Sequence, residues 1–127
     1  MDDIDASDLL ALVPALEHAQ REGTNRVYAA AKKAAHDLRD GWKRNARQTA
    51  PPHGKHYPRA ITAEQIPVSG EVLWEVGPES HLPQGGMGRG FEFGSIHQPP
   101  HWDGTNAAVK VEPEFLKAIE DALKDLL

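Results

Sequence analysis

The chain has 127 residues, of which 39% are apolar and 6% aromatic, with 10 prolines, 11 glycines and no cysteine. This length suits one domain, 1–127, with a modest core that oligomerisation would supplement. The cysteine count excludes disulfides, thiolate metal sites and cysteine nucleophiles, and no apolar run approaches the roughly 20 residues of a membrane span. The acidic N-terminus does not resemble a signal peptide, so we expect no membrane contact and synthesis in a cytoplasm.

Charge is distributed unevenly along the chain. Residues 1–19 carry five acidic side chains and no Lys or Arg, residues 20–60 carry ten basic against three acidic ones, and residues 61–127 carry four against eleven. The three net charges are therefore −5, +7 and −7. The basic middle is either a nucleic-acid footprint, a solvated helix face, or a surface that meets an acidic face of a neighbouring copy.

The N-terminal half is predicted to be helical in two pieces. Residues 1–23 read as a short helix and linker, and residues 24–50 as a long helix that must end before Pro51. The tripeptide Gly23-Thr24-Asn25 is expected to break the first helix and cap the second. The short helix has an apolar face formed by Leu9, Leu10, Val13 and Leu16.

The middle of the chain, residues 60–94, is predicted to be the β-region. Ile61–Val68 and Glu71–Val76 read as a hairpin around Ser69-Gly70, with Val72, Trp74 and Val76 on the apolar face. A third strand is expected at Phe91-Glu92-Phe93, with Phe91 and Phe93 on one face, Glu92 on the other, and a positive φ at Gly94.

The closing helix is expected at residues 112–127, with Pro113 as its first helical residue and an apolar stripe that includes Phe115, Leu116 and Ile119. Together the elements predict an α+β fold, in which a small antiparallel β-sheet packs against a long N-terminal-half helix and a C-terminal amphipathic helix.

Seven histidines raise the question of a metal site. His53-x-x-His56 and His97-x-x-x-His101 have ligand-like spacing, and Asp103 or Glu92 could complete a site. Both pairs lie in proline-rich sequence, where spacing alone does not orient the rings. We therefore expect no metal and no cofactor.

Two further patterns suggest catalysis only superficially. Gly86-x-Gly88-x-Gly90 lacks the βαβ context and the Gly-Lys-Ser/Thr of a phosphate-binding loop. Ser95, His97 and Glu92 resemble a hydrolytic set in composition, but they crowd onto one short stretch without a Gly-x-Ser-x-Gly elbow. We expect no catalytic residues and no enzymatic activity.

Three short motifs, taken in order, resemble a known family. They are Ala50-Pro51-Pro52-His53-Gly54 after the long helix, Phe91-Glu92-Phe93-Gly94-Ser95 before Gln98-Pro99-Pro100, and Phe115-Leu116-x-x-Ile119 in the closing helix. This order is similar to that of the tailed-bacteriophage neck proteins, the head–tail joining and tail-completion (minor tail component) family of siphophages. The family's Thr-Gly-x-Leu turn is replaced here by residues 53–57, and residues 101–112 are longer than its usual passage into the last helix.

The resemblance implies a structural virion protein that forms a ring, hexameric in such families, which joins or completes the tail at the head–tail interface. It implies contacts with further copies, with the head connector or stopper, and with tail-tube or tail-terminator proteins, and proximity to DNA in the lumen. Phe91, Glu92, Phe93, Gly94 and Ser95 would form the signature turn. The location would be the neck or tail of the virion, after synthesis in the bacterial host cytoplasm.

The alternative is a nucleic-acid-binding module that uses the basic helix 26–47. Phosphates would then meet side chains that could equally face a neighbouring subunit: Lys32, Lys33, Arg39, Lys43, Arg44 and Arg47.

Overall fold

A computed structural model describes residues 6–124, except for the side chains of residues 6–10, 12, 13 and 16. The predicted apolar face of Leu9, Leu10, Val13 and Leu16, and the last three residues of the predicted closing helix, lie outside what is described. None of the helices within residues 6–124 combines the length and apolar character needed to cross a membrane.

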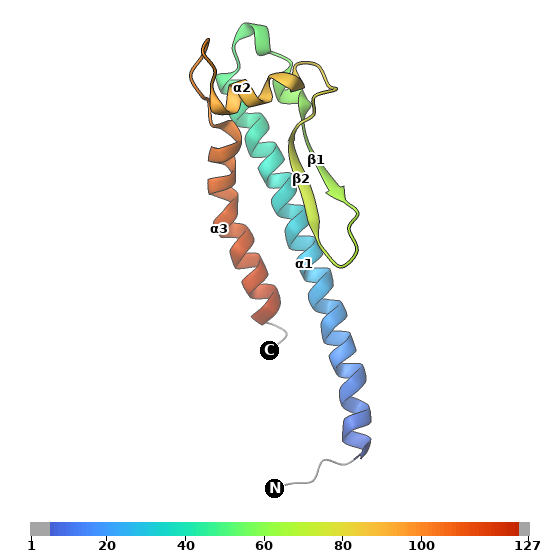
Figure 1. The fold of residues 1–127 in the computed structure, drawn as a ribbon. Coiled ribbons are helices and arrows are strands. Elements are labelled where there is room, and N and C mark those ends of the chain that lie inside the picture. Colours follow the sequence, from blue (N-terminus) through green and yellow to red (C-terminus); the bar gives the residue numbers. More distant parts are fainter. Residues whose placement is uncertain (1–5, 125–127) are drawn as a thin grey trace.

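A single long helix, α1 (Ala6–Thr49), organises the fold. An antiparallel hairpin of β1 (Ile61–Ile66) and β2 (Leu73–Pro78) runs along one side of α1, and α3 (Asp103–Lys124) runs along another (Figure 1). The short helix α2 (Gly88–Phe93) crosses the end where α1 finishes and α3 begins. The predicted α+β class is confirmed, with α1 as the helix on which both the sheet and α3 pack.

The predicted break at Gly23-Thr24-Asn25 is wrong, because α1 runs through it without interruption. The Thr24 hydroxyl donates to the Gln20 carbonyl, 2.9 Å away, within the helix, and so does not act as an N-cap. A glycine inside a helix costs only about 1 kcal/mol relative to alanine, which neighbouring turns can offset. The predicted end before Pro51 is confirmed.

The predicted hairpin is confirmed with shifted ends. The register pairs Ile61 with Pro78 and Ile66 with Leu73, and β1 ends just before Pro67, which cannot donate to a ladder. Val72, Trp74 and Val76 are half-buried, whereas Leu73 is exposed, as the alternation predicted.

The predicted third strand at Phe91–Phe93 is wrong, since these residues close α2. The Gly94 amide donates to the Gly90 carbonyl at 2.9 Å, a helical hydrogen bond. Three residues without a partner strand cannot satisfy their backbone groups as a sheet edge, but one helical turn satisfies them locally. Accordingly, Phe91 and Glu92 are both buried, while Phe93 is 60% exposed. Within the predicted β-region 60–94, the strands are confined to residues 61–78.

The predicted start of the closing helix at Pro113 is also wrong. Helix α3 begins at Asp103, and Pro113 lies inside it. Residues 106–111 therefore lie within α3, whose start is fixed by the side chains described below.

The core lies at the end of the molecule where α1, α2 and α3 meet. Its fully buried side chains are Ala46, Tyr57, Ile61 and Phe91, with Trp42 and Met87 packed against them. Gly41 of α1 allows close approach of α3, because a Cβ there would lie 3.3 Å from Ala107 Cβ.

Candidate assembly surface

Glu92 of α2 is the polar centre of the predicted signature turn. The residue is 5% exposed, and its carboxylate accepts hydrogen bonds from the backbone amides of Gly104 (2.9 Å) and Thr105 (2.8 Å) and from the Thr105 hydroxyl (2.8 Å). These amides are the unpaired donors at the start of α3, where a negative charge is favourable. Glu92 therefore caps α3 from another element.

Asp103, the first residue of α3, ties the same helix to the end of α1. The Thr49 hydroxyl lies 2.9 and 2.8 Å from its two carboxylate oxygens, and the Asn45 amide donates to the Asp103 carbonyl at 3.0 Å. Burial raises the pKa of Asp103, an effect that the Thr49 hydrogen bond and nearby His101 oppose. Asp103 and Glu92 thus join α1, α2 and α3 at one point.

Phe91 fills the apolar space beside this polar junction. Its ring stacks on His101 (centroids 5.4 Å apart, planes at 10°) and meets Tyr57 edge-on at 4.8 Å. Burial raises the pKa of Tyr57 to about 12, and the nearby Trp42 indole acts in the opposite direction. The Tyr57 hydroxyl and the Trp42 indole N–H are both buried, and neither has a hydrogen-bond partner in the described part of the chain. Phe91 is therefore a residue of the core.

The chain reverses between Gly94 and Trp102. Gly94 has the predicted positive φ, 83°, and a Cβ there would lie 2.9 Å from Pro100. Ser95 and Gln98 exchange backbone hydrogen bonds of 2.9 and 3.3 Å, and the amides of His101 and Trp102 return to the carbonyls of Phe91 and Glu92. The turn is therefore a closed loop held on the core by its two ends.

This loop presents apolar side chains to solvent. Ile96 at its tip is 95% exposed, and Phe93 and Trp102 at its base contact each other edge-on at 5.7 Å while both remain exposed. Ser95 is also at the exposed tip, where its hydroxyl accepts a hydrogen bond from the His97 amide at 3.2 Å. The Glu92 carboxylate is hydrogen-bonded to the start of α3, so Ser95, His97 and Glu92 do not form a hydrolytic set.

The predicted basic residues lie on α1, and part of their charge is neutralised within the helix. Lys33 pairs with Asp37 at 2.6 Å and Arg39 with Asp40 at 2.9 Å. The remaining predicted members, Lys32, Lys43, Arg44 and Arg47, are exposed or half-exposed. At 100° per residue, most of these positions follow the side of α1 opposite Ala31 and Leu38.

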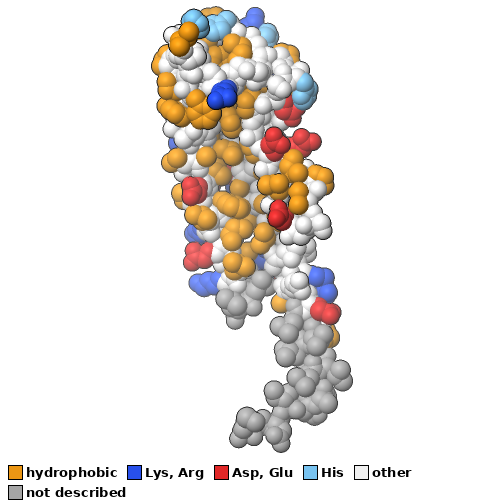
Figure 2. All heavy atoms as spheres, in the orientation of Figure 1, with side chains coloured by type: hydrophobic (Ala, Val, Ile, Leu, Met, Phe, Trp, Pro, Cys, Tyr) orange, Lys and Arg blue, Asp and Glu red, His pale blue; other side chains and the backbone are white. Residues whose placement is uncertain are grey.

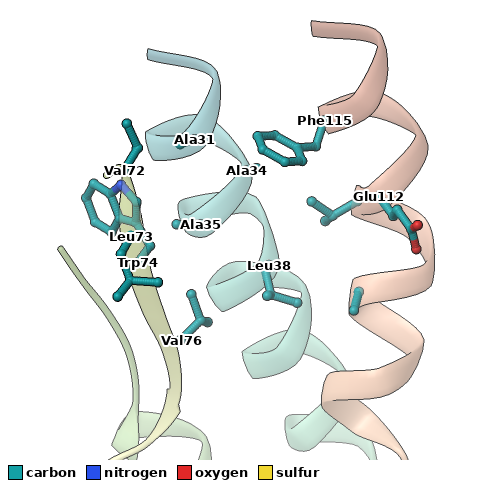
Figure 3. Close-up of a pocket in the computed structure, with 12 residues that line it drawn as sticks. Ala31, Ala34, Ala35, Leu38, Val72, Leu73, Trp74, Val76, Glu112 and Phe115 are labelled. Carbon is teal, nitrogen blue, oxygen red and sulfur yellow. The ribbon is translucent and has the colours of Figure 1, made fainter. Parts of the chain in front are cut away.

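An apolar groove lies on the Ala31 side of α1, between β2 and α3. Figure 3 shows α1 forming its floor, the side chains of β2 one wall and Phe115 of α3 the other. Figure 2 shows hydrophobic atoms gathered along this middle strip of the molecule. Besides Glu112 the lining is apolar: Ala31, Ala34, Ala35, Leu38, Val72, Leu73, Trp74, Val76, Ala108, Val111 and Phe115.

Helix α3 carries a further exposed apolar row. Val109, Leu116 and Leu123 are 64%, 56% and 50% exposed, and their seven-residue spacing places them along one line of the helix. The predicted amphipathic stripe is therefore wider than the surface that α1 covers.

His101 and His97 have different surroundings. His101 stacks on Phe91, with its Nδ1 atom 3.8 Å from an Asp103 oxygen, whereas His97 is exposed on the loop. Within residues 6–124 no group of three His, Asp or Glu side chains comes together in a way that could hold a metal ion.

Sequence reasoning singled out Glu92 and Gly94. It missed the hydrogen bonds of Glu92 to Gly104 and Thr105, and those that join Asp103 to Thr49 and Asn45. An acidic residue followed by Gly104-Thr105 and an Ala-Val pattern is a helix-start signal that could have placed the beginning of α3. The pairing of Thr49 with Asp103 spans 54 residues and has no local signal.

The chain matches no model of a known protein family, no curated protein and no solved structure.

Proposed function

We propose that the protein is a structural assembly component, and more specifically a neck or tail protein of a phage virion that forms a ring joining or completing the tail. The observation that carries the assembly role is the apolar groove on α1, walled by β2 and α3 and open to solvent. Large contiguous apolar surfaces on a folded chain mark sites of protein contact.

The loop 94–102 supports the same role. Glu92 and Gly94 fix its two ends on the core, and the result is a projecting tip with Ile96 almost fully exposed. A rigidly held apolar projection can insert into a neighbouring protein with little loss of conformational entropy. The order of the three sequence motifs supports the more specific phage role. It requires no catalysis and no cofactor.

The proposal is tested by purifying phage particles from the source of this sequence and measuring protein composition by quantitative mass spectrometry. A neck or tail ring should be present in a fixed low copy number per particle, and should remain after washing at high salt. Its absence from purified particles would contradict the phage role.

The runner-up function is nucleic-acid binding through the basic side of α1, favoured by the exposed Lys32, Arg44 and Arg47. The ion pairs of Lys33 and Arg39 reduce the charge available to phosphates. Binding of duplex DNA should then be weak at physiological salt. Tight binding whose affinity falls steeply with salt, by a protein that stays monomeric, would favour the nucleic-acid function instead.

A further inference from the structure

The end of the molecule where α1 finishes is built from two segments that are distant in the sequence, residues 50–60 and 79–102 (Figure 1). Gln84 joins them, because its side-chain oxygen accepts a hydrogen bond from the His56 amide and its side-chain nitrogen donates one to the His53 carbonyl, both at 2.6 Å. The two segments therefore form one body, which we call the basic end.

The exposed charged side chains of the basic end are all basic. Its two acidic residues are occupied within the chain. The buried Glu92 carboxylate is bonded to the start of α3, and the half-buried Glu79 accepts a hydrogen bond from the Thr62 hydroxyl and lies 2.9 Å from the His81 imidazole nitrogen. Figure 2 shows Asp and Glu side chains mainly along the hairpin and α3. The exposed Lys and Arg side chains of the basic end are Lys55, Arg59 and Arg89.

Apolar side chains accompany this positive charge. Ile96 is 95% exposed at the loop tip, and Phe93 and Trp102 contact each other while both remain exposed. Arg89 precedes Phe93 by four residues within α2, a spacing that places the two side chains on one side of the helix. Trp102 has a φ of 56°, a left-handed conformation that is unfavourable for a large side chain and that recurs at ligand-binding sites. The fold thus holds an exposed aromatic pair on the same side of α2 as a cation.

We propose that the basic end binds an acidic protein surface, with Ile96 in an apolar recess of that partner and Arg89 facing its carboxylates. The inference rests on the proposed assembly role and specifies the chemistry of the partner. Trp and Arg supply many of the strongest contacts in protein interfaces, within a surround that excludes water. Complementary charge also steers association and rejects partners of the same charge. The partner is therefore expected to be negatively charged around a small hydrophobic depression.

Two other classes of partner match these residues less well. Duplex DNA presents no apolar recess for Ile96, and three cations support only weak binding to phosphates at physiological salt. An anionic bilayer can receive Ile96, but one side chain and three cations provide little of the buried apolar area and charge that stable surface binding requires. A protein with an acidic, recessed surface matches both the charge and the projecting tip.

Arg89→Glu and Ile96→Ser test the two parts of the contact in a phage from which the gene has been deleted. Supplied in trans, each should lower the yield of infectious particles at least about tenfold relative to the wild-type gene, because each removes a central contact. Arg21→Glu and Val68→Ser are the matched controls, since they make the same kinds of change at exposed positions outside the basic end and should retain the wild-type yield. All four purified variants should keep the wild-type melting temperature, which separates loss of the contact from loss of the fold.

Suppressor mutations then identify the chemistry of the partner. Infectious revertants obtained with R89E should carry replacements of Asp or Glu by a neutral or basic residue in the contacted protein, because these restore complementary charge. Such a replacement in another virion gene would identify a different chain as the partner, and one in this chain would identify a second copy. Either location supports an acidic protein surface.

Full yields from both R89E and I96S, with a deletion that abolishes infectivity, would overturn the inference and leave the proposed function standing. An infectious deletion phage would instead contradict the proposed function, and the inference with it. Suppressors confined to basic or neutral positions, reversion at position 89 aside, would also overturn the acidic partner. So would binding of the purified wild-type protein to a duplex of about 30 base pairs, or to vesicles of about 30% phosphatidylglycerol in phosphatidylcholine, if R89E abolished that binding.

Discussion

Glu92 is buried although it is charged, and its carboxylate accepts three hydrogen bonds from Gly104 and Thr105. A charge in that position is tolerated because it faces the unpaired amides that begin α3. The residue marked in the sequence as part of a signature turn thus has a concrete structural task, which is to fix where α3 starts.

Replacing Glu92 should therefore loosen α3. Glu92→Ala leaves buried amides without an acceptor and should lower the free energy of unfolding by about 2–4 kcal/mol, while Glu92→Gln retains one acceptor and should cost less. Chemical denaturation followed by circular dichroism measures both. Glu120→Gln, on the exposed side of α3, is the control and should stay within about 0.5 kcal/mol of wild type. An E92A variant as stable as the control would rule out the capping role.

Gly94 combines a positive φ with close contact to Pro100, and three glycine-to-alanine variants separate these effects. Gly94→Ala should cost about 2–4 kcal/mol, because it adds backbone strain and a clash 2.9 Å from Pro100. Gly70→Ala, with φ 78° and open space, should cost only the strain, about 1 kcal/mol. Gly86→Ala has neither feature and should be neutral. Melting temperatures in this order are expected, and equal values for all three would contradict the role assigned to Gly94.

At the scale of elements, the substitution Asn25→Ala tests whether α1 is continuous through Asn25. The sign of the change in stability distinguishes a continuous helix from two helices. Inside a helix, Asn25→Ala improves helix propensity and should raise the helical signal and slightly stabilise the protein, by about 0.5 kcal/mol. At an N-cap the same change would cost about 1 kcal/mol. The circular dichroism of N25A against wild type makes this measurement, and a loss of helicity would restore the two-helix interpretation.

Local patterns were enough to predict some elements. The end of α1 before Pro51 and the alternation of Val72, Trp74 and Val76 depend on proline chemistry and on a period of two, which neighbouring residues reveal. Phe91–Phe93 resembled a strand by composition, but it had no partner strand and became helical. Its conformation depends on hydrogen bonds with residues 101–105, which lie on the other side of the intervening loop. A local pattern within residues 91–93 does not reveal these bonds.

Pro113 misled the prediction of α3 for a related reason. Proline is favoured in the first turn of a helix, yet here the start is set ten residues earlier, by Asp103 and by the caps from Glu92. Tertiary capping overrides the local signal. The candidate turn could thus be located from the sequence, but Gly104 and Thr105, the partners of Glu92, could not.

For the molecule as a whole, the main feature is that α1 is covered on two sides and open on a third. The groove lies between the hairpin and α3, and Val109, Leu116 and Leu123 are exposed on α3. A chain with so small a core gains stability by burying such surfaces against other chains. This is the physical basis for an assembly role, to which the motif order adds the expectation of a phage neck or tail.

The most direct test of that role is electron microscopy of lysates from a phage whose gene for this protein has been deleted. A joining protein should leave full heads beside separate tails, and a tail-completing protein should leave tails of abnormal length. Supplying the wild-type gene in trans should restore complete particles. Normal, infectious particles in the deletion lysate would contradict the proposed function.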